Sequence, residues 1–289
     1  MKALSLILLC ATLLCMMCAA PAWAQNGALS QSVAPQQTAV PAVAPTTSAA
    51  AAVPPAAASA PTQSYDLAAD AVIESLNVRY SDVRGTNFPN EFSAIGALAG
   101  FGCQMAVREG YIAHGVITAE KAFIPFKGAD GQTFYFGSFL NAALLGNEKV
   151  HTSVWSLVAS GAQQAGAKQL PDVQEIAAYN IKTAGTPAFG VPRLPAKYQP
   201  RVLPVEALKK TWPGVRKILT DNQVDPKYWG WTLALAAQKL ILQNKSVFDP
   251  ALAAQTIMEA AMPMSKIDPQ MIRQVDDTPP PLRPVPDDN

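Results

Sequence analysis

Histidine and cysteine, the residues that most often bind metals or act as nucleophiles, are scarce in this sequence. The chain of 289 residues has two histidines and four cysteines, and three of the cysteines lie among the first 24 residues. Two histidines without cysteine or carboxylate at ligand spacing make no zinc site. If the first 24 residues are removed, Cys103 is the one cysteine left, so stability has to come from a packed core rather than a disulfide.

An excess of charge of either sign is also missing. Lys2 is the only charged residue among the first 24, and removing it from the 22 basic residues leaves 21, which balances the 21 acidic residues. A neutral chain lacks the electrostatic footprint of a protein that binds nucleic acid or anionic lipid. We therefore expect no nucleic-acid partner.

Sequence motifs of common enzyme classes are absent as well. The chain has no Gly-x-Ser-x-Gly elbow, no phosphate-binding loop of the Walker type and no dinucleotide fingerprint after a strand. We therefore expect neither a cofactor nor a metal.

The N-terminal segment 1–24 has the pattern of a signal peptide. Lys2 precedes an apolar stretch from Ala3 to Met17, and the segment closes with the small residues of Ala22-Trp23-Ala24. This order is what a signal peptidase recognises, and it predicts a bacterial protein that is periplasmic or secreted. An uncleaved membrane anchor is the alternative, because the apolar run up to Pro21 approaches the ~20 residues that span a bilayer.

Two compositionally biased segments flank the rest of the chain. Residues 25–63 are rich in Ala and Pro and carry no charge, which predicts a disordered linker. Residues 276–289 are Pro-rich and acidic. Such a tail either docks in an aromatic groove as a polyproline helix or is a solvated terminus. Residues 64–275 are long enough for one globular domain.

Helix signals dominate this domain. Aspartate caps free amides and proline suits the first helical position, so an Asp-Pro pair before apolar-periodic residues marks a helix start. Three such pairs occur, at Asp225-Pro226, Asp249-Pro250 and Asp268-Pro269. Asp172 predicts a fourth start, for a helix that ends near Gly185.

Two further segments have the apolar spacing of core helices. One stripe consists of Val205, Leu208, Trp212, Val215 and Leu219. Pro213 interrupts it and predicts either a kink at Trp212 or two short helices. The segment from Tyr228 to Asn244 is apolar nearly all round, and we expect it to be the central helix of the core.

One β-hairpin is predicted. Ala122–Phe126 and Gln132–Phe136 are aromatic, β-rich runs separated by a short turn that contains Asp130-Gly131. Pro125 cannot donate to a ladder, so its strand should be an edge, and a lone hairpin needs helices to lie against. The predicted fold is mainly α: a single helical domain with one small β-hairpin packed on it, flanked by disordered arms.

The stretch from Phe92 to Val107 is unusually rich in small residues. Gly96 and Gly100 share a helix face with Cys103 nearly on it, so another backbone can approach closely there. In a membrane this pattern would favour a dimerising helix. Because the stretch is short for a span, we expect a buried helix of a globular domain.

Cys103 is the one candidate thiol nucleophile, with His114 or His151 as the imidazole that would activate it. The cysteine lies inside an apolar helix rather than at a helix start, where the dipole would stabilise a thiolate. An inert core cysteine is therefore the expectation, and a cysteine-dependent hydrolase is the alternative.

The segment from Pro187 to Pro200 is a long irregular loop that is nevertheless apolar and aromatic. Loops of this length inside a domain tend to be functional, but a rigid strap over the core has the same composition. Its candidate binding residues are Arg193, Tyr198 and Phe189, because arginine and aromatic side chains are favoured at interfaces.

These features predict a non-catalytic, exported bacterial module that binds another envelope or secreted protein, within a larger envelope assembly. The alternative is an exported cysteine-dependent hydrolase that uses Cys103 with His151 or His114. The membrane is a partner only if the N-terminal segment is retained as an anchor. The sequence leaves the oligomeric state open.

Overall fold

A computed structural model describes residues 61–83 and 85–272 of the chain. The predicted signal peptide, nearly all of the predicted linker and the predicted C-terminal tail lie outside the described residues. The first described helix, α1 (Pro61–Tyr80), begins within the range 25–63 that its composition assigned to the linker.

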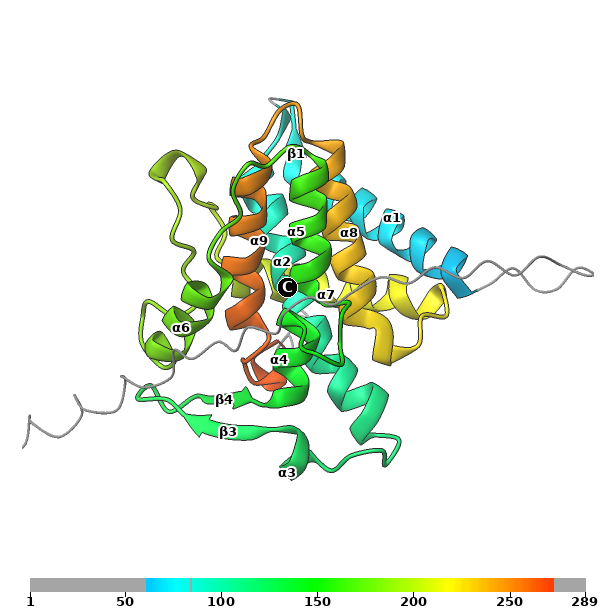
Figure 1. Ribbon diagram of the computed structural model, residues 1–289, viewed down its shortest axis with the longest axis vertical. Helices are drawn as coiled ribbons and strands as arrows, with labels where there is room; N and C mark the ends of the chain where they lie inside the picture. Colours follow the sequence, from blue (N-terminus) through cyan, green and yellow to red (C-terminus); the bar gives the residue numbers. More distant parts are fainter. Residues whose placement is uncertain (1–60, 84, 273–289) are drawn as a thin grey trace, which may run out of the picture. The chain divides into compact units, whose positions relative to one another are not determined.

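Helices make up most of the described residues (Figure 1). After α1 the chain forms β1 (Ser81–Asp82), β2 (Gly85–Thr86), α2 (Phe88–Met105), the π-helix η1 (Ala106–Ile112), α3 (Ala119–Ala122), β3 (Ile124–Lys127), β4 (Thr133–Phe136), α4 (Ser138–Leu145), α5 (Val154–Gln164) and α6 (Val173–Thr183). The second half consists of the 3-10 helix η2 (Ala196–Tyr198), α7 (Pro204–Asp221), the 3-10 helix η3 (Pro226–Tyr228), α8 (Trp229–Gln243), α9 (Pro250–Met264) and the 3-10 helix η4 (Pro269–Ile272). The mainly α fold with a small hairpin is confirmed.

Helix α2 is the central helix of this assembly. It contacts α1, α4, α7, α8 and α9, and every residue from Asn90 to Gln104 is buried. The segment 228–244, which we expected to be the central helix, forms α8 instead. Helix α8 lies beside α2 and keeps part-exposed residues such as Trp231 and Gln238. The small side chains of α2 account for the difference, since they let neighbouring helices approach from every side.

Close backbone contacts surround α2, as its glycine pattern predicted. A Cβ atom placed on Gly96 would lie 2.3 Å from the carbonyl oxygen of Ile257, and one on Gly100 would lie 2.0 Å from that of Ala261. Both partners belong to α9. On the side of α8, a Cβ atom on Gly230 would lie 2.6 Å from the Sγ atom of Cys103. Without side chains at these positions, α2 and its neighbours can touch along their backbones.

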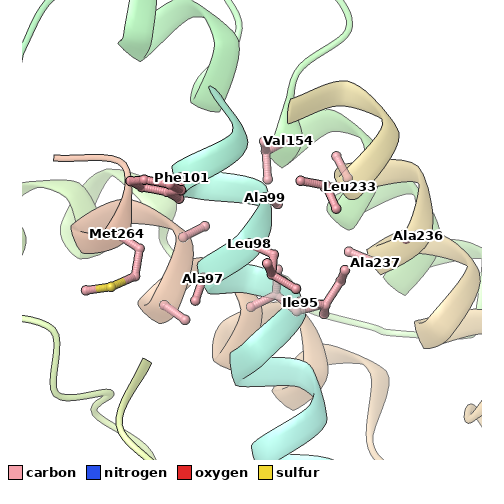
Figure 2. Packing of buried hydrophobic residues seen from close by; sticks show 14 of the residues in the cluster. Ile95, Ala97, Leu98, Ala99, Phe101, Val154, Leu233, Ala236, Ala237 and Met264 are labelled. Atoms are coloured by element: carbon pink, nitrogen blue, oxygen red, sulfur yellow. The ribbon is translucent and has the colours of Figure 1, made fainter. Parts of the chain in front are cut away.

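Apolar side chains fill the remaining faces of α2. Figure 2 shows Leu233, Ala236 and Ala237 of α8 on one side of α2, and Phe101 of α2 pointing to the other side, where Met264 lies. The described residues form no disulfide. Burial of such apolar side chains is therefore the main favourable contribution to folding.

Two of the four predicted helix starts begin α-helices in the structure. Asp249 accepts a hydrogen bond from the backbone N–H of Leu252 (2.8 Å) and caps α9, while Asp172 caps α6. Asp225 and Asp268 each cap a short 3-10 helix instead, and α8 follows the first of these directly.

Helix α7 runs through Pro213 without a break, so the second of the two alternatives predicted there, a pair of short helices, is not formed. Leu208, Trp212, Val215 and Leu219 are buried on one face, whereas Pro213 is exposed. Because the apolar stripe is anchored on both sides of the proline, the packing of the helix outweighs the hydrogen bond that proline removes.

The predicted hairpin is formed by β3 and β4, with Pro125 opposite Tyr135. Strand β3 is an edge, while β4 also bonds the chain after α9: the N–H of Tyr135 donates to the carbonyl of Lys266 (2.7 Å). The Arg108 guanidinium of η1 lies 4.6 Å from the ring centre of Phe123 and 4.4 Å from that of Tyr135. The hairpin is thereby fixed to the helices.

A second pair of very short strands, β1 and β2, had no sequence signal.

Among the described residues, the carboxylate of Glu91 and the ammonium group of Lys266 are buried without a partner of opposite charge. Glu91 is fully buried, both of its carboxylate oxygens lack a hydrogen-bond partner, and burial raises its pKa to about 7. Lys266 is nearly buried, its Nζ donates to Oδ1 of Asn141 (2.9 Å), and burial lowers its pKa to about 8. Both groups lower the stability of the folded chain at neutral pH.

The glycine contacts predict opposite effects for two Gly→Ala substitutions. Gly100→Ala should lower the free energy of unfolding by about 3 kcal/mol or more, because its Cβ meets backbone that cannot move alone. Gly214→Ala, on α7 with no atom within 4 Å of the new Cβ, should raise it by up to about 1 kcal/mol. Urea unfolding measures both changes in the free energy of unfolding. Equal changes for the two variants would contradict the close contact between Gly100 and Ala261.

Glu91 predicts a pH dependence of stability. Its pKa of about 7 lies above the ordinary 4.5, so between these values the folded chain holds a proton that the unfolded chain has lost. The free energy of unfolding should therefore fall by about 3 kcal/mol as the pH rises through this window, and Glu91→Gln should remove the loss. Unfolding curves at several pH values test this. Parallel profiles for the two proteins would show that Glu91 does not titrate in this way.

Candidate functional site

The segment between α6 and α7, residues 185–203, is the candidate site, and we call it the strap. It contains the predicted loop 187–200, and its one regular element is η2. Prolines at four positions remove backbone donors and favour an extended course. They are Pro187, Pro192, Pro195 and Pro200.

Both ends of the strap are held by the rest of the chain. Gly185 has a φ of +77°, and a Cβ atom there would lie 2.6 Å from Cα of Gly128 in the hairpin turn. At the other end, Oδ1 of Asn90 accepts hydrogen bonds from the N–H groups of Arg201 (2.7 Å) and Val202 (3.2 Å). The strap is therefore tied to the hairpin and to the first turn of α2.

Arg193 fixes the middle of the strap to α6 and α9. Its guanidinium makes two hydrogen bonds to Glu175 (2.6 and 2.8 Å), lies 2.8 Å from Oε1 of Glu259 and stacks 3.9 Å from the ring centre of Tyr179. The hydrogen bonds to Glu175 are the main cause that raises the pKa of Arg193. Burial raises the pKa of Glu259, although the guanidinium opposes this shift.

A polar hollow of about 310 Å³ lies beside this ion-pair cluster. Its lining includes Glu175, Arg193 and Glu259, together with Asp172 and Gln255. The side-chain amide of Gln255 also donates to the carbonyl of Arg193 (3.2 Å).

An apolar hollow of about 340 Å³ borders the first part of the strap, and we call it the Phe189 groove. Its apolar lining includes Phe134, Phe189, Leu203, Met264, Ile267 and Met271, and Asp130 and Gln132 add polar groups. The rings of Phe189 and Phe134 meet edge to face with centres 4.7 Å apart. Apolar and aromatic lining with few polar groups is typical of sites that bind ligands or peptides.

The far end of α2 positions one wall of this groove. Gln104 is fully buried, and its side-chain amide donates to the carbonyls of Ser265 and Ile267, at 3.0 Å each. A buried polar group with two such bonds holds the chain after α9 in one place.

The three predicted binding residues do not converge on one point. Arg193 lines the polar hollow and Phe189 lines the apolar one, whereas Tyr198 packs on Phe248 with ring centres 5.6 Å apart. All three side chains contact their own chain, as the rigid-strap alternative requires, and both hollows border the strap. Sequence reasoning missed the partners from α6, α9 and η4, because no local pattern signals contacts between distant segments.

Cys103 and the two histidines are not brought together. Cys103 is 2% exposed, and burial raises the pKa of its thiol to about 12. His114 is exposed with Nδ1 3.0 Å from the carbonyl of Glu109, and His151 is exposed between α4 and α5. Within the described residues neither imidazole hydrogen-bonds to the thiol. This arrangement disfavours thiolate formation and offers a substrate no access to the sulfur.

Metal-binding clusters and membrane-spanning helices are both missing from the described part of the chain. No group of three or more His, Cys, Asp or Glu side chains there is arranged to hold a metal ion. Among the same residues, no helix combines the length and apolar character needed to span a bilayer.

Comparisons with known proteins found no matching family model, no matching curated protein and no matching solved structure. The chemistry of the chain's own residues therefore carries the functional conclusion.

The packing of Cys103 predicts different costs for two substitutions. Cys103→Ser should lower the free energy of unfolding by about 1 to 3 kcal/mol, because a hydroxyl would replace the thiol in an apolar site. Cys103→Ala should cost less, since it leaves no polar group to satisfy. Thermal melts compare the two. Unchanged melting, together with rapid reaction of the native thiol at neutral pH, would instead favour a nucleophile.

The ion-pair cluster predicts that its two carboxylates differ in importance. The side chain of Glu259 is 2% exposed and that of Glu175 is 55% exposed. Arg193→Met should lower the free energy of unfolding by about 3 kcal/mol, because it leaves the buried Glu259 carboxylate uncompensated, and adding Glu259→Gln should restore part of the loss. Glu175→Gln should cost less, because solvent screens the charge of this exposed carboxylate. A larger effect at Glu175 would contradict this order.

Proposed function

We propose that the protein is a non-catalytic, exported bacterial module that binds another envelope or secreted protein through the strap. The observation that carries this proposal is that the strap borders both hollows while tight contacts hold it in one conformation. A preformed surface loses little conformational entropy when a partner binds, which favours affinity. Val191 and Leu203 of the strap are exposed apolar side chains and supply contact area.

Export is the second part of the proposal. It is supported by the charged start, apolar stretch and Ala22-Trp23-Ala24 end of segment 1–24, which lies outside the described residues. On this basis the mature chain begins at Gln25 in the periplasm or outside the cell. N-terminal sequencing of the native protein identifies the cleavage site, and an intact Met1 would favour the membrane anchor.

Site-specific photo-crosslinking tests the strap as the binding surface. A photoreactive residue at Val191 or Leu203, which are 39% and 46% exposed, should capture the same envelope protein. The matched control is Val247, which is 63% exposed in the turn between α8 and α9 and should capture nothing comparable.

Binding of the purified partner then supplies the decisive measurement. Phe189→Ala should weaken it by about tenfold or more, in line with the loss of an aromatic anchor, with the melting curve recorded to exclude unfolding. Equal capture at all three positions, or unchanged affinity in a folded Phe189→Ala protein, would refute the strap as the contact surface.

A further inference from the structure

The Phe189 groove is a partly open apolar surface with nothing packed into it from the described residues. Phe134 and Met264 at this groove are nearly buried, whereas Phe189 and Met271 are part-exposed and Leu203 is 46% exposed. Methionine and aromatic side chains together adapt to ligands of varied shape. An exposed apolar hollow of this kind is usually covered by a binding partner.

The C-terminal part of the chain starts at this groove. Ile267 and Met271 line it, and the described chain ends one residue further, at Ile272. The six residues 273–278 can span roughly 20 Å at the maximum length per residue, so the Pro-rich run 279–286 can reach back over the groove. Attachment through so short a connection gives the run an effective concentration in the millimolar range.

The run 279–286 also has the chemistry that this groove would bind. Consecutive prolines favour a polyproline helix, which loses little entropy on docking and is recognised by aromatic-lined grooves. Leu282 provides an apolar side chain within the run. Arg283 provides a positive charge, and the groove lining contains the carboxylate of Asp130.

We propose that residues 279–286 dock in the Phe189 groove of their own chain, with Leu282 against Phe189 and Met271 and Arg283 beside Asp130. The docked run then shields the groove, and an external partner at this part of the strap has to displace it. The inference rests on the groove and on the tail attached to it, and it is independent of the proposed envelope partner. A purified protein is sufficient to test it, so its failure is distinguishable from failure of the proposed function.

Methyl NMR of the full mature chain labelled at methionine provides the test. Met271 reports on the groove, and Met258, fully buried within α9, is the internal control. Leu282→Asp should shift the Met271 methyl signal and leave that of Met258 in place. The matched tail control, Asp288→Asn, should shift neither signal.

A synthetic peptide of residues 276–289 extends the test to affinity. Added to the Leu282→Asp protein, it should return the Met271 signal toward its position in the unchanged chain. Asp130→Asn keeps the Oδ1 atom that accepts from the N–H of Gln132 (3.0 Å) and removes only the charge. This substitution and an Arg283→Gln peptide should each weaken binding up to about fivefold, and their combination should weaken it no further than either alone.

Two results would overturn the proposal. One is a Met271 signal that neither Leu282→Asp nor the peptide moves. The other is a signal that moves only as protein concentration rises, together with a doubled mass in solution, because the groove would then hold the tail of a second copy.

Discussion

The backbones of α2 and α9 touch where Gly96 and Gly100 face Ile257 and Ala261, and the position of α9 depends on this contact. Any side chain larger than hydrogen would move the two helices apart. Glu259 lies on α9 two residues from each of these contacts and holds Arg193, so the distance between the two backbones determines where the middle of the strap lies. The site is thus built on a helix pair whose separation is fixed by the absence of side chains.

Helix α2 controls the strap and the groove from its two ends. Near its start, the buried side chain of Asn90 bonds two backbone N–H groups of the strap, and near its end Gln104 bonds two carbonyls of the chain after α9. Each amide satisfies backbone groups that would otherwise be costly to bury. A central helix otherwise made of small and apolar residues therefore uses two polar side chains to place the loops around it.

Local chemistry in the sequence predicted the local structure well. Asp172 and Asp249 start helices, the two aromatic runs around Asp130-Gly131 pair as a hairpin, and Gly96 marks a close contact. The central place of α2 was not predictable, because the sequence predicted two buried helices, over 92–107 and 228–244, and only packing decides which one is enclosed. The ion pairs of Arg193 could not be predicted either, since Glu175 and Glu259 lie on separate helices and charge alone does not indicate a partner.

The strap is fixed unevenly along its length. Arg193 is held by ion pairs and Tyr198 packs on Phe248, whereas three of the four residues between them, 195–197, are exposed. Sites of insertion that proteins tolerate are exposed turns between well-anchored backbone. Related chains can therefore gain or lose residues at this tip during evolution while the anchors on either side, and the two hollows beside them, keep their geometry.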